Sequence, residues 1–136
     1  NKKIVLIQQF RPGTISRNSG NYLNEIVAGI IDKGETPEET AIRECFEETG
    51  CKAKNLRAIQ GYFPAPGSSE SFYHLFLCEV VAPNKEIIRG LQNENEDILV
   101  KSYSFEEVKK KMENNEILNG LTLIALQWFF LNIYKS

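Results

Sequence analysis

The sequence predicts an α/β fold of the α+β kind, in which β-strands pack against helices. Five segments rich in aliphatic and aromatic residues are bounded by Pro, Gly, Asn or Ser, which is the pattern of strands. Two capping boxes, Thr36 with Glu39 and Ser104 with Glu107, each mark the start of a helix. Near the end, residues 121–134 are strongly apolar with helical spacing.

Composition narrows the class of protein. A chain of 136 residues with 42% hydrophobic and 25% charged residues is typical of one globular domain, here residues 1–136. The net charge of −2 gives no basis for binding nucleic acid, and no apolar run reaches the length of a membrane span. Three cysteines without paired metal-type spacing favour a reducing, cytoplasmic setting. Because the chain begins without Met, we expect it to be part of a longer protein.

The first two strands are predicted at Lys3–Arg11 and Tyr22–Ala28. Pro12 and Gly13 break the first strand, and a polar loop follows. The second strand delivers the chain to Gly29.

The first helix is predicted to begin at Pro37 and to end at Gly50, which can adopt the left-handed conformation that closes a helix. At about 100° per residue, four side chains gather on an expected core face: Ala41, Ile42, Cys45 and Phe46. Glu44, Glu47 and Glu48 gather on the opposite face. Such carboxylates repel by about 1 kcal/mol per pair in water. They indicate either a solvated acidic face or a site that holds a cation.

Three more strands and two more helices follow. The strands are predicted at residues 54–63, 70–81 and 98–103, and the helices at residues 104–114 and 121–134. A turn at 64–69 and an irregular, mobile loop at 84–97 separate the strands. One packed face is expected on the last helix: Leu123, Leu126, Gln127, Phe130 and Tyr134. We expect His74 to pack in the core or on a strand face, and Trp128 to belong to the core.

The stretch from Gly29 to Cys51 resembles the Nudix box of hydrolases that cleave a nucleoside diphosphate linked to another moiety. All seven fixed positions of that pattern are filled: Gly29, Glu35, Arg43, Glu44, Glu47, Glu48 and Gly50. A chance match arises about once in 10⁸ to 10⁹ starting points. Cys45 and Cys51 stand where the family usually has an aliphatic residue. The resemblance implies a Nudix α/β/α sandwich with a mixed β-sheet between helices.

Outside the box, the chain resembles the ADP-ribose pyrophosphatase branch of the family. The matching segments are 7–11, 25–29, 66–70, 94–98 and 124–128. Members that hydrolyse GDP-mannose or other nucleotide sugars share the Pro-Gly turn and the Asn119-Gly120-Leu121-Thr122 helix entry, so both substrates stay open. A catalytically silent nucleotide sensor is a third hypothesis. The branch also implies a homodimer, formed through an N-terminal sheet of which little is present before Lys3.

The resemblance assigns the metal site to the box helix. It implies Mg²⁺, with Mn²⁺ as a substitute, and two or more ions. Glu44 and Glu48 correspond to the principal ligands, with Glu48 also counted as catalytic, and Glu47 to a direct or water-mediated ligand. The Ala28 carbonyl corresponds to a backbone ligand. Hard divalent cations prefer such oxygen ligands.

The remaining roles lie around the metal site. Glu35 and Arg43 correspond to residues that orient the carboxylates. Glu94 matches the general base and Glu96 a further metal ligand, although Glu94 has the alternative of a solvated loop acid, with Glu96 or Glu47 then next as base. Arg11 is a candidate for a phosphate or ribose contact, and a plain strand-end charge is its alternative. Glu70 is either a ribose ligand or the end of a turn.

Overall fold

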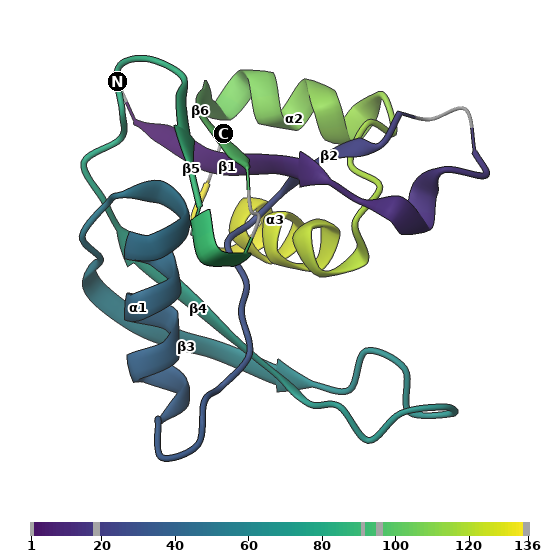
Figure 1. Cartoon of the computed structure of the whole chain (residues 1–136). Coiled ribbons are helices and arrows are strands. Elements are labelled where there is room, and N and C mark those ends of the chain that lie inside the picture. The colour runs from purple at the N-terminus through teal and green to yellow at the C-terminus, as the bar shows by residue number, and fades with distance from the viewer. Residues whose placement is uncertain (1, 18–19, 91, 95–96, 135–136) are drawn as a thin grey trace.

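The computed structural model describes residues 2–17, 20–90, 92–94 and 97–134 (Figure 1). The strands are β1 (Lys3–Phe10), β2 (Tyr22–Glu25), β3 (Lys54–Tyr62), β4 (Tyr73–Glu79), β5 (Ile87–Arg89) and β6 (Ile98–Ser104). The helices are α1 (Pro37–Thr49), α2 (Phe105–Glu113) and α3 (Gly120–Asn132). Two short 3₁₀ turns lie at Pro12–Thr14 and Gln92–Glu94. In this part of the chain, no helix is long and apolar enough to cross a membrane.

The strands form two sheets. One has the order β2-β1-β6-β5, and the other is the β3-β4 hairpin. The predicted class, with helices packed against sheets, is confirmed. The expected mixture of strand directions is not found, because every pairing in the described residues is antiparallel.

The four-stranded sheet is covered on both faces because successive strand residues point to opposite sides. Leu6 of β1 is fully buried with Val108, Ile117 and Leu126, so this face packs against α2 and α3. The neighbouring Ile7 belongs to a second cluster on the other face, together with Ile98 and Val100. α1 contacts β4, β5 and β6 and lies in front of the β3-β4 hairpin in Figure 1. The fold therefore places α1 between the hairpin and the larger sheet.

Several element boundaries differ from the sequence prediction. β2 ends at Glu25 rather than Ala28, and β4 begins at Tyr73 rather than residue 70. The loop expected at 84–97 contains β5, whose residues pair with the start of β6 from Ile98 to Val100. Three residues are too few to show a periodic sequence pattern. The strand forms because these residues pair with β6.

The buried face of α1 is rotated from the predicted one. Ile42 and Phe46 are each 47% exposed, so half of the expected core face is wrong. The buried residues are Thr40, Cys45, Glu48 and Thr49. Thr40 donates a hydrogen bond to Glu35 and Thr49 one to the Cys45 carbonyl, which satisfies their hydroxyls.

Three predictions for aromatic and C-terminal residues have mixed outcomes. On α3, Leu126 and Thr122 are buried whereas Gln127 is exposed, which corrects the predicted face. His74 is exposed on β4 and packs edge-on against Phe72, with ring centroids 5.1 Å apart, so the strand-face alternative is confirmed. Trp128 is half-buried, and the guanidinium of Arg57 lies over its ring, 5.5 Å from the ring centroid.

Candidate functional site

The carboxylates of the predicted site lie on a helix whose two ends are fixed by local chemistry. Thr36 accepts a hydrogen bond from the backbone of Glu39, while the Glu39 side chain accepts one from the backbone of Thr36. At the other end, Gly50 has φ 72°, and its N–H bonds the Phe46 carbonyl. The predicted start and end of the helix are both confirmed, so the spacing of its acidic residues is fixed as well.

Arg43 joins the acidic side chains. Its Nε and Nη2 bind the two oxygens of Glu35 at 2.7 and 3.0 Å. Its Nη1 binds Glu44 at 2.8 Å and Glu47 at 3.0 Å, and Nη2 also donates to the Ile30 carbonyl at 3.2 Å. One guanidinium therefore holds three carboxylates together and offsets part of their mutual repulsion. Hydrogen bonds to Glu35 and then Glu44 raise the pKa of Arg43 above its usual value.

The Glu35 carboxylate stays ionised at pH values well below its usual pKa. Hydrogen bonds from Arg43 and then Thr40 lower its pKa from 4.5 to about 2. Glu35 thus remains a charged partner for Arg43 at any ordinary pH.

This shift predicts an acid-sensitive contribution to stability. Between pH 4.5 and about 2, the unfolded chain binds a proton at Glu35 that the folded chain does not. The stabilisation is therefore complete above pH 4.5 and is lost as the pH falls toward 2. Urea unfolding of the wild type and Glu35→Gln across this range should show their difference in unfolding free energy shrinking with acidification. A difference that is independent of pH would contradict this account.

Glu48 is held against the segment that precedes the helix. Glu48 is only 5% exposed. Its Oε2 accepts a hydrogen bond from the Ala28 N–H at 3.3 Å. At the next position, a Cβ on Gly29 would overlap the carboxylate of Glu44. The chain at residues 28–29 therefore lies directly on two carboxylates of α1, and the second of these contacts requires glycine.

The side chains present fit a divalent cation in their chemistry. Glu44, Glu47 and Glu48 supply only carboxylate oxygens, at spacings of three and four on one helix, and hard cations take such ligands. In the part of the chain that the structure describes, no three His, Cys, Asp or Glu side chains already form a metal-binding group. Glu96 lies outside the described residues, as does the side chain of Glu94, whose backbone ends the 3₁₀ turn at Gln92–Glu94.

Arg11 has a structural partner that sequence analysis missed. Its Nε binds Glu25 at 2.8 Å, and the other Glu25 oxygen accepts a hydrogen bond from Asn119 at 2.7 Å. Glu25 is 3% exposed, whereas the Arg11 side chain is 43% exposed. Asn119 also caps α3 by accepting from the Thr122 N–H. The link therefore ties β1, β2 and α3 together. Arg11, Glu25 and Asn119 all lie in segments that the resemblance singled out, namely 7–11, 25–29 and the Asn-Gly-x-Thr helix entry. They come together only in the folded chain, so the sequence does not show that they are in contact.

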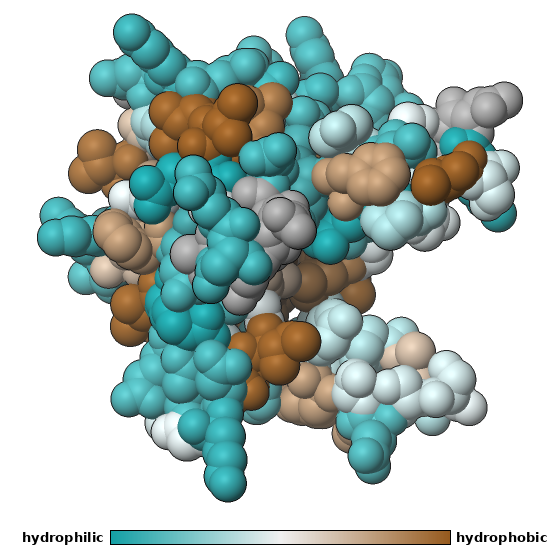
Figure 2. All heavy atoms as spheres, in the orientation of Figure 1, coloured by the Kyte–Doolittle hydropathy of each residue, from teal (hydrophilic) through white to brown (hydrophobic). Residues whose placement is uncertain are grey.

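Glu70 lies away from this cluster. With Phe63, Pro66 and Ser69 it lines a cavity of about 370 Å³ at the end of the β3-β4 hairpin. This end projects away from α1 in Figure 1, and Figure 2 shows that the face is hollowed between it and the part of the molecule formed by β1 and β2. The structure thus brings Glu35, Arg43 and the α1 carboxylates together, but places Glu70 at the end of the hairpin that projects away from α1.

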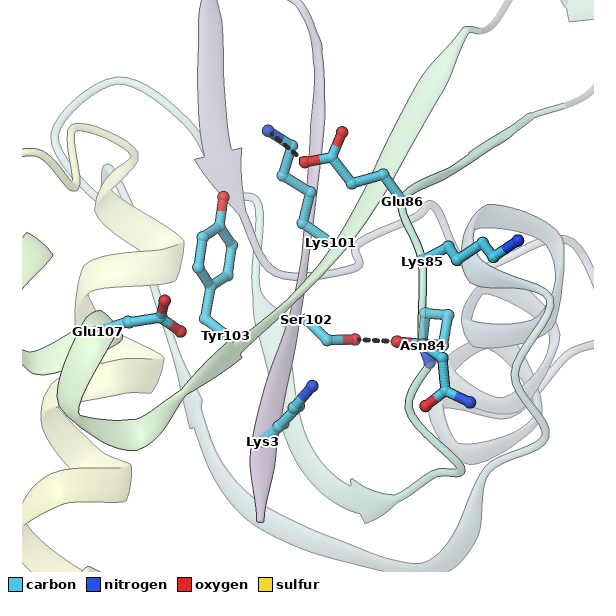
Figure 3. A pocket seen from close by; sticks show the side chains of 9 residues that line it. Lys3, Asn84, Lys85, Glu86, Lys101, Ser102, Tyr103 and Glu107 are labelled. Atoms are coloured by element: carbon cyan, nitrogen blue, oxygen red, sulfur yellow. Dashed lines mark hydrogen bonds and ion pairs between the residues drawn. The ribbon is translucent and has the colours of Figure 1, made fainter. Parts of the chain in front are cut away.

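A second cavity, of about 270 Å³, is lined by none of the predicted site residues (Figure 3). Two pairs among its polar groups are bonded to each other: Lys101 pairs with Glu86 at 3.0 Å, and Ser102 donates to the Pro83 carbonyl at 3.0 Å. It is a polar surface hollow beside β1 and β6.

Comparison of the sequence with known proteins points to one family. The NUDIX domain model matches residues 1–121. The chain is 37% identical over 132 residues to an ADP-ribose pyrophosphatase of Haemophilus influenzae, covering 95% of this chain and 61% of that protein. It is 35% identical to an ADP-ribose pyrophosphatase of Bacillus subtilis, covering 93% and 64%, and 32% identical to a GDP-mannose pyrophosphatase of Shigella flexneri, covering 93% and 66%. The chain thus spans less than two thirds of the length of these relatives.

Proposed function

Because the chain belongs to the Nudix domain family, we propose that it hydrolyses the pyrophosphate bond of ADP-ribose to AMP and ribose 5-phosphate, with a divalent metal ion. The observation that carries this proposal is the carboxylate cluster of α1, which Arg43 and the backbone at residues 28–29 hold in one place. A pyrophosphate carries negative charge on both phosphates, so carboxylates can approach it only through a cation. A cluster of this kind therefore suits a metal-assisted phosphate hydrolase.

Family members generally depend on a divalent metal, and we propose Mg²⁺, with Mn²⁺ as a substitute and two or more ions. Glu44 and Glu48 would be the principal ligands, with Glu47, Glu96 and the Ala28 carbonyl completing the set. When bound, the metal neutralises phosphate charge and lowers the pKa of the attacking water.

The protein's own groups orient the reactants and move the proton. Arg43 and Glu35 fix the carboxylates of Glu44 and Glu47, which supports their assignment as orienting residues. Glu94 accepts a proton from the attacking water as the new oxygen–phosphorus bond forms and the bridging oxygen–phosphorus bond breaks. Arg11 is exposed enough to contact a phosphate while its Nε remains on Glu25. Glu70 would hold a ribose hydroxyl.

Substrate identity is supported by the relatives rather than by the site. Relatives named ADP-ribose pyrophosphatase are 35% to 37% identical, and those named GDP-mannose pyrophosphatase are 32% identical. GDP-mannose or another nucleotide sugar is therefore the second candidate. Retention of all box carboxylates and of Arg43 argues against a silent sensor. We further propose a cytoplasmic homodimer for the whole protein.

The test is turnover of ADP-ribose and GDP-mannose side by side with Mg²⁺, with the products separated and Glu48→Gln as the blank. Preferential release of AMP and ribose 5-phosphate, absent from the blank, is expected. Preferential cleavage of GDP-mannose would transfer the proposal to the second candidate. Binding of either nucleotide without cleavage would overturn hydrolysis and favour the sensor.

Gly29→Ala should impair turnover without unfolding the protein. The new Cβ would overlap the Glu44 carboxylate, which is the movable end of a side chain, so this carboxylate is displaced while the backbone stays. We expect turnover to fall by roughly 10–100-fold, as when a metal site loses an orienting contact. Thermal unfolding should change little. Gly13→Ala is the control, because its Cβ would meet nothing within 4 Å. Equal activity of both variants would show that the position of Glu44 is unimportant.

A further inference from the structure

Asn119, at the start of α3, makes hydrogen bonds in two directions. Its Oδ1 accepts from the backbone N–H of Thr122 at 2.9 Å and from the Thr122 hydroxyl at 2.8 Å. A backbone N–H can only donate, so this contact fixes which end of the amide is the oxygen. The Nδ2 group therefore faces Glu25 and donates to its Oε1 at 2.7 Å. Asn119 is thus fixed as a donor to a carboxylate that is 3% exposed.

Glu25 divides its two oxygens between two partners. Oε1 accepts from Asn119, and Oε2 accepts from Arg11 Nε at 2.8 Å. A guanidinium can bind both oxygens of one carboxylate, but here the second oxygen accepts from Asn119 instead. Among the residues that the structure describes, none is hydrogen-bonded to Nη1 or Nη2 of Arg11. These two nitrogens are therefore available for a second anion.

The backbone of Arg11 is fixed as well as its Nε. Its N–H donates to the Asn21 carbonyl at 2.8 Å, and its own carbonyl accepts from the Thr14 hydroxyl at 2.8 Å. The Arg11 side chain nevertheless remains 43% exposed. A charged group that is ordered before its ligand arrives loses less conformational freedom on binding. Arg11 is therefore preorganised to bind an anion from solution.

The same end of α3 holds the segment that lies on the carboxylate cluster. Thr122 is fully buried, and its hydroxyl accepts a hydrogen bond from the Ile26 N–H at 3.0 Å. Two residues further on, the Ala28 N–H donates to Glu48. The three residues from Glu25 to Ala28 extend over at most about 10 Å. The anchor of the guanidinium is therefore close to the carboxylates that would hold the metal.

We propose that Asn119 is a positioning residue for the substrate, which acts through Glu25 to hold the Arg11 guanidinium so that its Nη1 and Nη2 bind a phosphate of a nucleoside diphosphate. The guanidinium suits this ligand because its planar fork matches two phosphate oxygens. Lysine at position 11 could pair with Glu25 but would have no second edge for the phosphate. This role rests on the proposed function, which supplies the diphosphate.

The first measurement detects the hydrogen-bonded link without substrate. In ¹H–¹⁵N NMR spectra of the intact chain, the Arg11 Nε–H signal is identified by its absence from Arg11→Lys. Asn119→Ser keeps a helix cap, because serine can also accept from the Thr122 N–H, but its side chain is too short to reach Glu25. Loss of one hydrogen bond to a charged group should make the Nε–H of this variant exchange with water roughly tenfold faster than in the wild type.

The second measurement is steady-state turnover of ADP-ribose with Mg²⁺. Asn119→Ser should raise KM by roughly tenfold with little change in kcat, because a contact made equally in the ground state and the transition state affects KM alone. Arg11→Lys should raise KM at least as much. In the double variant, Asn119→Ser should add nothing further, since both changes break the same chain of hydrogen bonds.

Asn114→Ser is the matched control. Asn114 also donates to a glutamate, Glu116 at 3.3 Å, but it is exposed at the end of α2, so KM should stay at the wild-type value. Asn119→Asp is a second test variant, because it caps the helix equally well and places an oxygen against Glu25 in place of the donor. It should reproduce the rise in KM. Thermal unfolding of each variant verifies that the proteins compared are folded.

Unchanged Nε–H exchange in both Asn119 variants would overturn the proposal. So would KM effects of Asn119→Ser and Arg11→Lys that multiply in the double variant, or a fall in kcat with KM unchanged, because Asn119 would then not act through Arg11. If the wild type releases no AMP, the proposed function fails, whereas the Nε–H exchange still decides whether Asn119 holds Arg11.

Discussion

Glu48→Gln is expected to reduce kcat by more than about a hundredfold without unfolding the protein. Loss of a group that merely orients a metal ligand already costs about 10–100-fold, so loss of a principal ligand should exceed that range. Glutamine has nearly the same shape and can still accept the hydrogen bond from the Ala28 N–H. Glu48 is only 5% exposed, and a buried charge without a partner would destabilise the fold. Because the glutamine amide is neutral, the substitution introduces no such charge.

The measurements are turnover with Mg²⁺, binding of Mn²⁺ by calorimetry, and thermal unfolding. Glu38→Gln is the control, because Glu38 lies in the first turn of the same helix and is exposed. We expect Glu48→Gln to lose both turnover and metal affinity, while Glu38→Gln keeps both. Undiminished metal affinity in Glu48→Gln would remove this residue from the ligand set.

Glu94→Gln is expected to lower turnover by two or more orders of magnitude, within the range of about 10²–10⁴-fold for loss of a general base. Its backbone ends the 3₁₀ turn at Gln92–Glu94, just before β6. Folding should be unaffected. Unlike Glu48→Gln, this variant should retain its metal affinity, which distinguishes a base from a ligand.

The control for this loop is Asp97→Asn, since Asp97 is an exposed acid close in sequence to Glu94. In the wild type, turnover should fall at low pH as the general base is protonated. Glu94→Gln has no such group, so this fall in turnover should be absent from the variant. Near-normal turnover would place the base elsewhere, and the same substitution at Glu96 and Glu47 would then be measured.

Local signals predicted α1 well because they act within a few residues. The Thr36 capping box and the left-handed Gly50 are present as expected. The face that α1 buries was predicted less well. Hydrophobicity assigned Ile42 and Phe46 to the core, but β4 and the segment at residues 28–29 cover the side with Cys45 and Glu48 instead. Periodicity identifies a helix, whereas its neighbours decide which side is covered.

The candidate site shows the same division. Spacing alone placed Glu44, Glu47 and Glu48 on one face, and the resemblance assigned Arg43 an orienting role that its contacts support. The Glu25 link between Arg11 and Asn119 was missed, because its members are far apart in sequence and meet only after β1, β2 and α3 assemble. β5 was missed for the same reason, since it forms by pairing with β6, which lies nine or more residues further along the chain.

The most direct test of the account is release of AMP from ADP-ribose by protein freed of metal with a chelator, before and after Mg²⁺ is added back. We expect no release in chelator and full release with Mg²⁺, with ribose 5-phosphate formed in equal amount. Hydrolysis that continues at an unchanged rate in chelator would contradict the account, because the α1 carboxylates would then have no cation to hold.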